Sequence, residues 1–180
     1  MPDQLDYSHE VTVSEMLEAR DRRVEMQRSM IAETKNPVIC FMLNVPGPHK
    51  VDDTLMWAFE TGVHRILVKL EEVGITVSRS ITEREITGFV FYAAVEADAV
   101  QVKQKMCELE DADRLGRLFD IDVIGLDGRK VSREEFGMAP RKCLMCGKEA
   151  HICARNRSHT VQEMTAEIHR IIQAAQGVAR

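Results

Sequence analysis

Residues 37–45 (PVICFMLNV) form a run of nine residues that carries no charged side chain. Successive side chains of a strand point to opposite faces, so a continuous apolar run of this kind predicts a strand buried on both faces. A strand of this kind lies inside a layered domain, with its sheet covered on each side. The stiff turn Pro46-Gly47-Pro48 follows and marks its end.

The segments around this strand predict helices and further strands in a regular order. Apolar spacing predicts helices over residues 13–33, 52–73, 98–111 and 160–176, and strands over residues 75–81, 85–95 and 119–124. Thr12 or Ser14 can cap the first helix, and Gly74 stands just past the second. The Asp127-Gly128 pair signals a hairpin that returns through residues 130–132, and residues 134–142 are expected to be loop.

This order predicts an α+β fold. We expect a mixed, mostly antiparallel sheet with a ferredoxin-like βαββαβ core, an N-terminal helix, a Cys-rich loop and a C-terminal helix. A length of 180 residues suits one domain over residues 1–180, with the Cys-rich loop at about 141–159 as an appendage.

The composition argues against several classes of protein. Apolar residues make up 44% of the chain, which is enough for a true core, and the net charge of -5 argues against a general nucleic-acid binder. No apolar run approaches the length of a membrane span, and the first residues lack the basic and apolar parts of a signal peptide. We therefore expect a cytoplasmic protein with no nucleic-acid and no membrane partner.

Two carboxylates stand two positions apart within the apolar strand at 119–124. In a strand, Asp120 and Asp122 point to one face and their apolar neighbours to the other. A paired-acid face is typical of sites that hold a divalent cation such as Mg²⁺ for phosphoryl or nucleotidyl transfer, and Arg117 just before it can meet the phosphates. A solvated face is the simpler interpretation, but the apolar surroundings favour a compensating cation.

Three of the five cysteines lie close together, between Cys143 and Cys153. An odd number of cysteines in a reducing compartment indicates a metal site or free thiols rather than a disulfide framework. The Cys143-x2-Cys146 spacing is the usual first half of a tetrahedral zinc site. Cys153 and His159 would complete a Cys3His set, His151 is an alternative ligand, and a loop with three free thiols is the simpler possibility.

Basic residues surround this segment. A cationic rim beside the acid pair would receive a polyphosphate, although solubility alone also explains such charges. The rim consists of Arg141, Lys142, Arg155 and Arg157. Arginines between residues 20 and 28 give the first helix a second basic surface.

Several of these segments resemble one known family. Residues 115–123 (LGRLFDIDV), 140–146 (PRKCLMC) and 153–155 (CAR) with His159 resemble the citrate lyase holo-acyl-carrier-protein synthase family, whose members are apo-citrate lyase phosphoribosyl-dephospho-CoA transferases. Residues 17–22 (LEARDR) and 44–50 (NVPGPHK) fit the same family, so the resemblance covers nearly the whole chain. The chain departs from the family pattern at Asp113-Arg114, where His-Pro is usual.

The resemblance implies a concrete reaction. The enzyme would attach 2'-(5''-triphosphoribosyl)-3'-dephospho-CoA to a serine of the citrate lyase acyl carrier protein through a phosphodiester, with release of pyrophosphate. Mg²⁺ on Asp120 and Asp122 would bridge the phosphates and acidify the serine hydroxyl. The leaving pyrophosphate would be neutralised by Arg117 together with Lys50, Arg141 or Arg155. The basic first helix would attract an acidic carrier.

Three alternatives stay open at this point. The first is a nucleotidyltransferase for another carrier protein, such as that of malonate decarboxylase. The second is a non-catalytic zinc-knuckle interaction module whose acid strand is structural. The third is a regulatory homologue that binds the precursor without transferring it.

Overall fold

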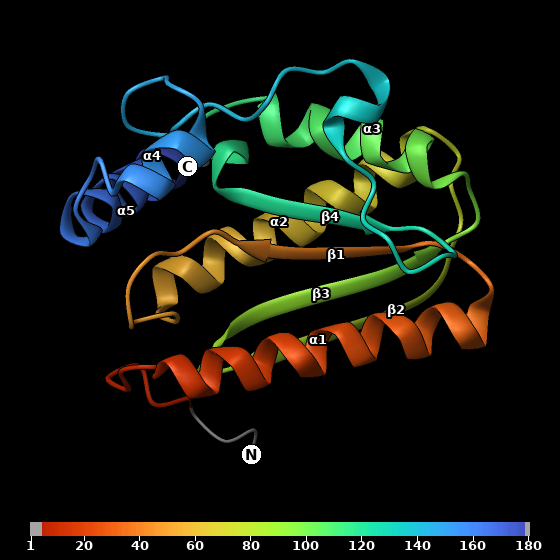
Figure 1. Cartoon of the computed structure of the whole chain (residues 1–180), viewed down its shortest axis with the longest axis horizontal. Helices are drawn as coiled ribbons and strands as arrows, with labels where there is room; N and C mark the ends of the chain where they lie inside the picture. Colours follow the sequence, from red (N-terminus) through yellow and green to blue (C-terminus); the bar gives the residue numbers. More distant parts are fainter. Residues whose placement is uncertain (1–4, 179–180) are drawn as a thin grey trace.

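The computed structural model describes residues 5–178 and is built around one four-stranded sheet. Its strands lie in the order β2-β3-β1-β4, and all three pairings are antiparallel (Figure 1). They are β1 (Val38–Leu43), β2 (Val77–Glu85), β3 (Gly88–Val95) and β4 (Phe119–Ile124). The predicted α+β class with a mostly antiparallel sheet is confirmed, and the apolar run at 37–45 is the interior strand β1.

Two helices connect the strands. Helix α2 (Asp53–Glu72) follows β1, and α3 (Ala99–Asp111) follows β3, so the elements from β1 to β4 have the order βαββαβ. Each helical connection skips one strand, because β3 lies between β1 and β2 while β1 lies between β3 and β4. Strand β4 is therefore an edge strand.

The two faces of the sheet are covered by different helices. One face carries Ile39, Phe41 and Phe119 and packs in a large apolar cluster with residues of α2, α3 and α5 (Val161–Val178). The other face carries Cys40 and Tyr92 and packs on Met30 of α1 (Val13–Thr34). Helix α1 lies mainly on β1, β2 and β3, which leaves this face of β4 uncovered (Figure 1).

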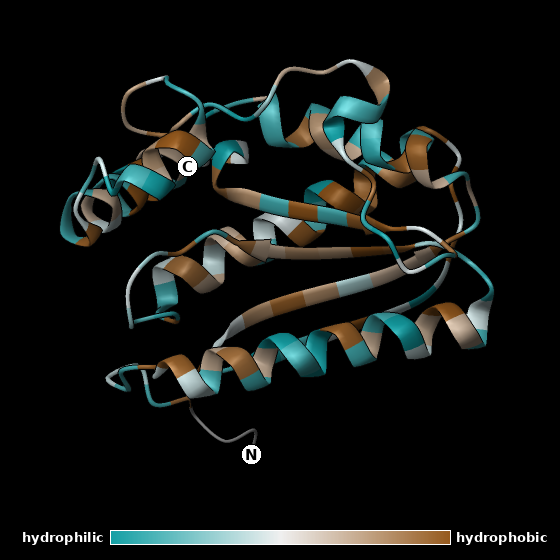
Figure 2. Cartoon of the chain, in the orientation of Figure 1, coloured by the Kyte–Doolittle hydropathy of each residue, from teal (hydrophilic) through white to brown (hydrophobic). Residues whose placement is uncertain are grey.

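The hydropathy of each element matches this layering. In Figure 2 the interior strands are mostly hydrophobic, while α1 alternates between hydrophobic and hydrophilic turns. A Cβ at Gly62 of α2 would lie 2.3 Å from the Phe41 ring, so only glycine allows α2 this close to the sheet. Among the described helices, none is both long and apolar enough to span a membrane.

Polar side chains cap the helix starts. Thr12, a predicted cap, forms a capping box with Glu15 at α1, and Asp52 accepts the backbone N–H of Leu55 at α2. Gly74, with φ +69°, follows the end of α2, as predicted.

The predicted hairpin after Asp127-Gly128 forms: Ile124 is bridged to Lys130, and the Val131 N–H donates to the Val123 carbonyl. Its return is too short to count as a strand, because the chain then turns toward α3, where Arg133 binds two acids. Two other local expectations were wrong. The expected loop at 134–142 begins within a short 3-10 helix, η2 (Arg133–Phe136). The Cys-rich segment contains an unpredicted helix, α4 (Ala150–Asn156).

Candidate active site and metal centre

The acid pair lies on the open face of the edge strand. Asp120 and Asp122 share that face, whereas Phe119, Ile121 and Val123 are fully buried on the other, as the alternation predicts. Because α1 does not cover β4, the Asp120 side chain stays 42% exposed and that of Asp122 stays 28% exposed. The two carboxylates are therefore accessible to a ligand from solvent.

The two carboxylates have different partners. Asp122 forms an ion pair with Lys130, which the turn after β4 brings back beside it. Asp120 Oδ1 lies 3.7 Å from Arg141 Nη1. Burial, followed by the charge of Asp122, raises the pKa of Asp120 above its ordinary value. A cation between the two carboxylates would relieve this repulsion.

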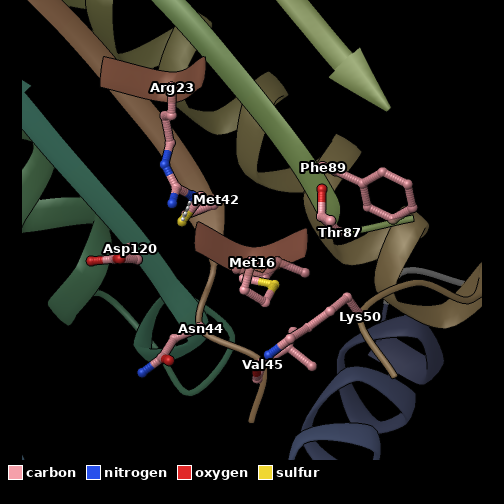
Figure 3. A pocket seen from close by; sticks show the side chains of 11 residues that line it. Met16, Arg23, Met42, Asn44, Val45, Lys50, Thr87, Phe89 and Asp120 are labelled. Atoms are coloured by element: carbon pink, nitrogen blue, oxygen red, sulfur yellow. Dashed lines mark hydrogen bonds between the residues drawn. The ribbon is translucent and has the colours of Figure 1, made fainter. Parts of the chain in front are cut away.

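A cavity of about 220 Å³ opens beside Asp120, between α1 and the end of β1 (Figure 3). Arg23 reaches into it from α1, with Nη1 3.0 Å from Met42 Sδ. Lys50 Nζ donates a hydrogen bond to the Val45 carbonyl at 2.6 Å, and burial lowers the pKa of this lysine. Of the predicted phosphate-binding cations, Lys50 is the one that lines this cavity.

A second cavity, of about 690 Å³, lies between the start of β4, the Cys-rich segment and α5. Arg117, which lies in the 3-10 turn η1 (Gly116–Leu118), lines it together with Arg141 and Lys142, and Asn44 lines both cavities. Arg117 donates a hydrogen bond to the Lys142 carbonyl. Arg155 is exposed on α4 and lines neither cavity.

A buried acid supports the outer edge of β4. Glu110 of α3 is 1% exposed; its Oε1 accepts the backbone N–H of Ile121 at 2.9 Å, and its Oε2 accepts Arg133 Nη2 at 2.6 Å. Lys103 of the same helix donates to the Ile121 carbonyl. These side chains satisfy backbone groups that an edge strand otherwise leaves unpaired.

Arg141 joins this buried network to the acid pair. Its Nη2 donates to the carbonyls of Arg117 and Phe119, at 2.9 Å and 2.8 Å. Its Nη1 lies 3.7 Å from both Glu110 Oε1 and Asp120 Oδ1. The guanidinium is thus held at the mouth of the large cavity and within reach of Asp120.

The Cys-rich segment brings four potential metal ligands together. The ligand atoms of Cys143, Cys146, Cys153 and His159 all lie within 4.8 Å of one another. His159 Nε2 is buried without a hydrogen-bond partner among the described residues, which fits a nitrogen that binds a metal. His151 is exposed and faces Glu149 instead, so the geometry favours His159 over the alternative.

The donor set matches zinc. Three thiolates and one imidazole form a common tetrahedral Cys3His site, and Cys146 Sγ lies 3.4 Å from Cys153 Sγ. A hydrogen bond from the Lys148 backbone and others within the cluster lower the pKa of Cys146 to about 6. The hydrogen bond with Cys146 raises the pKa of Cys153 to about 11. One thiolate is therefore already favoured before a metal binds.

Some residues of these sites carry no signal in the sequence. Glu110 has the spacing of a solvated helix charge, and Met164 of α5, which lines the large cavity, has the spacing of a core residue. Arg23 lies among other arginines that the sequence does not distinguish. Asn44 could have been singled out, because it is the polar residue that ends an apolar strand just before a Pro-Gly turn.

Comparison with known proteins decides the family. The family model described as apo-citrate lyase phosphoribosyl-dephospho-CoA transferase (CitX) matches residues 11–175. The chain belongs to this family. The match includes β4 with its acid pair, both cavities and all four residues of the Cys3His cluster, so the family covers every site described above.

Named relatives of the family have similar identity to this chain, and two of the three described next also have similar length. The apo-citrate lyase phosphoribosyl-dephospho-CoA transferase of Citrobacter koseri is 30% identical over 167 residues, which is 93% of this chain and 91% of the relative. A probable enzyme of the same name from Streptococcus pyogenes serotype M18 is 32% identical over 91% of this chain and 86% of the relative. Protein CitXG of Haemophilus influenzae is 31% identical, and the matched region is 35% of that longer protein.

Proposed function

We propose that this protein transfers the 2'-(5''-triphosphoribosyl)-3'-dephospho-CoA group to a serine of the apo citrate lyase acyl carrier protein, with release of pyrophosphate. The observation that carries the proposal is the acid pair on the open face of β4, with Arg141 3.7 Å from Asp120, in a chain of this transferase family. Membership in a transferase family favours catalysis over a non-catalytic zinc module.

Asp120 and Asp122 would hold Mg²⁺. In proteins this ion is usually bound by one or two carboxylates and completed by substrate phosphates, and the uncovered face of β4 leaves room for phosphate oxygens. A bound ion would add positive charge at the α-phosphate and acidify the serine hydroxyl. The two carboxylates would fix the ion on a rigid strand, so that it meets the phosphate in one position.

The cations around the acid pair would neutralise the leaving pyrophosphate. Arg141 is held by backbone carbonyls, so its guanidinium is already oriented when substrate arrives. Lys50 extends into the small cavity beside Asp120, and Arg117 and Lys142 line the large one. The role of Arg155 at the pyrophosphate stays a prediction, because its side chain lines neither of the two cavities.

The Cys3His cluster would hold a structural zinc ion. Cys143, Cys153 and His159 also line the large cavity, so an ion at their centre would fix one of its walls. Such an ion has four protein ligands and no open position, which is typical of structural rather than catalytic zinc. We place the reaction in the cytoplasm, where thiols stay reduced.

The direct test is pyrophosphate release by the purified protein with Mg²⁺, the triphosphoribosyl-dephospho-CoA precursor and the apo carrier protein. Mass spectrometry of the carrier should show a gain of one phosphoribosyl-dephospho-CoA group. The Asp120→Asn and Asp122→Asn variants should lose this gain. Asp127→Asn is a matched control, because Asn-Gly suits the same turn as Asp-Gly.

Replacing the carrier separates the remaining alternatives. Transfer to the citrate lyase carrier but not to the malonate decarboxylase carrier supports the proposal. Transfer to the malonate-type carrier alone would reassign the enzyme. Binding of the precursor with no pyrophosphate released from it, whichever carrier is present, would indicate a regulatory homologue.

A further inference from the structure

The large cavity has an apolar floor that the reaction at Asp120 does not use. Its volume of about 690 Å³ falls within the range of about 300–1,000 Å³ that is usual for pockets for small molecules and cofactors. Helix α5 supplies Val161, Met164 and Ile168, and the opposite wall supplies Leu118 and Leu144. Such a floor suits a flat, apolar group rather than a triphosphate.

The rim of the same cavity is cationic. Lys142 and Arg157 line it, both side chains are exposed, and neither has an ion pair or side-chain hydrogen bond within residues 5–178. Arg157 is held in a left-handed conformation, with φ 48°, at the end of α4. Cations without acidic partners beside an apolar floor are suited to a nucleotide, whose base is apolar on its faces and whose phosphates are anionic.

The cavity also lies close to the acid pair. Asn44 lines both cavities, and Arg141 lines the large one while its Nη1 lies 3.7 Å from Asp120 Oδ1. One extended ligand can therefore occupy the large cavity and still place a distant phosphate beside Asp120. A triphosphate alone is too polar to fill both.

We propose that the large cavity binds the adenosine diphosphate part of the dephospho-CoA group. The adenine would lie on the floor formed by α5, and its diphosphate would meet Lys142 and Arg157. The triphosphate, which is carried by the second ribose on the 2' position of the adenosine, would then reach Asp120 past Arg141. This assignment rests on the proposed function, because it takes the substrate from it.

Helix α5 is anchored in the core beside the cavity. Ile168, Ile171 and Ile172 are buried in the main core and anchor the helix, while Met164, one turn before Ile168, is only half-buried and faces the cavity. The side chain at position 164 can therefore be changed without opening the core. This makes it the position at which filling the cavity tests the proposal.

The test uses two probes that cannot react, 3'-dephospho-CoA and ADP. Titration calorimetry measures their binding to the zinc-loaded protein. Both should bind the unmodified protein. Met164→Trp, which fills the cavity, should weaken both by at least about tenfold, which is ~1.4 kcal/mol. Lys142→Gln removes one rim charge without touching the core and should weaken both by about fivefold.

Matched controls separate cavity effects from general ones. Ala174→Trp adds the same side chain at an exposed position of α5, and Lys148→Gln removes an exposed lysine from the same segment; neither residue lines the cavity. Both should bind the probes within about twofold of the unmodified protein. In the transfer assay, Met164→Trp should raise KM for the precursor and largely preserve kcat.

The possible failures are distinguishable. If Met164→Trp and Lys142→Gln bind both probes like the unmodified protein, the cavity assignment is overturned while transfer can still stand. If pantetheine binds like dephospho-CoA and is weakened by the same variants, the adenosine diphosphate assignment is overturned. If the probes bind as expected but the precursor releases no pyrophosphate with any carrier, the proposed function fails and the nucleotide site remains.

Discussion

At the scale of single residues, Asp120 and Asp122 lie on one face of a strand and yet differ in their electrostatic surroundings. Asp122 is neutralised by Lys130, whereas Asp120 has Arg141 at 3.7 Å and Asp122 beside it. The pKa of Asp120 is raised by burial first and by Asp122 second. Asp120 therefore gains most from a cation.

We expect Asp120→Asn to abolish transfer without lowering Tm. A metal ion contributes several kcal/mol of charge stabilisation, so the loss should be at least about 100-fold in kcat/KM. Stability should not fall. Asp120 ionises near its ordinary pKa of 3.8 in the unfolded chain but at a higher pH in the folded protein, so above pH 3.8 its charge destabilises the fold. The uncharged asparagine removes that cost. Thermal unfolding at neutral pH and the transfer assay check both parts, and an unfolded variant would contradict them.

Glu110 is the residue whose loss should cost most stability. Its carboxylate is buried against Arg133 at 2.6 Å, and the side chains of Arg141 and Lys103 lie 3.7 Å and 3.8 Å from it. Removing one partner of a buried ionic cluster typically costs about 3–5 kcal/mol, so Glu110→Ala should reduce the free energy of unfolding by about that much. Urea denaturation measures it.

A neighbouring acid provides the control for this prediction. Glu108 lies on the same helix and pairs with Lys105 and Lys69 at the surface. Glu108→Ala should cost only about 0–1 kcal/mol, as exposed ion pairs do. Equal losses for the two variants would show that the buried cluster has no special role.

Strand alternation was enough to predict the common face of Asp120 and Asp122. Their ion-pair partners could not be predicted, because Arg141 and Lys130 belong to other segments that only the folded chain places beside the two carboxylates. Glu110 could not be recognised either, since a helix periodicity gives the same spacing to a solvated acid and to a buried one.

At the scale of elements, a single histidine connects the last helix to α2. His169 of α5 places Nε2 2.8 Å from Asp52 Oδ2 and Nδ1 2.9 Å from the Thr165 carbonyl. A neutral imidazole has one N–H, so only the protonated ring can donate to both acceptors. Burial alone would lower the pKa of His169, but these hydrogen bonds outweigh it and raise the value above 6.5.

The attachment of α5 should therefore weaken as the pH rises. A raised histidine pKa contributes stability that is complete below 6.5, the ordinary value, and is lost as the pH rises through the folded value. Between about pH 6 and pH 9 we expect a loss of about 0.5–1 kcal/mol, which His169→Gln should remove. Urea denaturation at both pH values and an NMR titration of His169 check this, and an unchanged pH dependence in the variant would contradict it.

The metal centre should stabilise one segment rather than the whole fold. We expect about one zinc ion per chain by elemental analysis, and its loss in Cys146→Ser. Hydrogen exchange after chelation should show lost protection over residues 141–159 and retained protection in the sheet. Cys107→Ser, at a buried thiol outside the cluster, should keep the metal. Global unfolding on chelation would contradict the picture of an appendage.

The main elements were predictable because their periodicity and caps agree. The interior strand, α2 with Asp52 and Gly74, and the order from β1 to β4 all follow from local pattern. Helix α4 was not predictable, because its seven residues are too few to show a helical repeat of apolar positions. Its position also depends on the four cysteine and histidine side chains that cluster around it.

At the scale of the whole molecule, both cavities are assembled from segments that are far apart in the chain. The small one joins α1 to β4, and the large one joins the end of β1 to α5. A sequence pattern reports which residues share a face of one element but not which elements meet. Arg141, Lys142 and Arg157 of the predicted cationic rim line the large cavity, whereas Lys50 lines the small one and Arg155 lines neither.

We expect the surface of α1 next to the small cavity to meet an acidic carrier protein. Val13 and Leu17 are 78% and 55% exposed one turn apart, and Arg20, which is also exposed, follows on the same side. Arg20→Glu should raise KM for the carrier by about tenfold, and this increase should be smaller at high salt because salt screens the charges. Binding of dephospho-CoA should not change. Arg170→Glu on α5 is the control; an equal effect of both would point to net charge alone.

The cover over the outer edge of β4 also affects how the protein is made. Glu110 and Lys103, which bind the backbone of Ile121, come before β4 in the chain, but Arg141, which binds the Phe119 carbonyl, comes after it. During synthesis on the ribosome there is thus an interval in which a finished sheet exposes unpaired backbone groups. Chains released early in that interval should be prone to assemble edge to edge, and a chaperone that binds exposed strands would act at that stage.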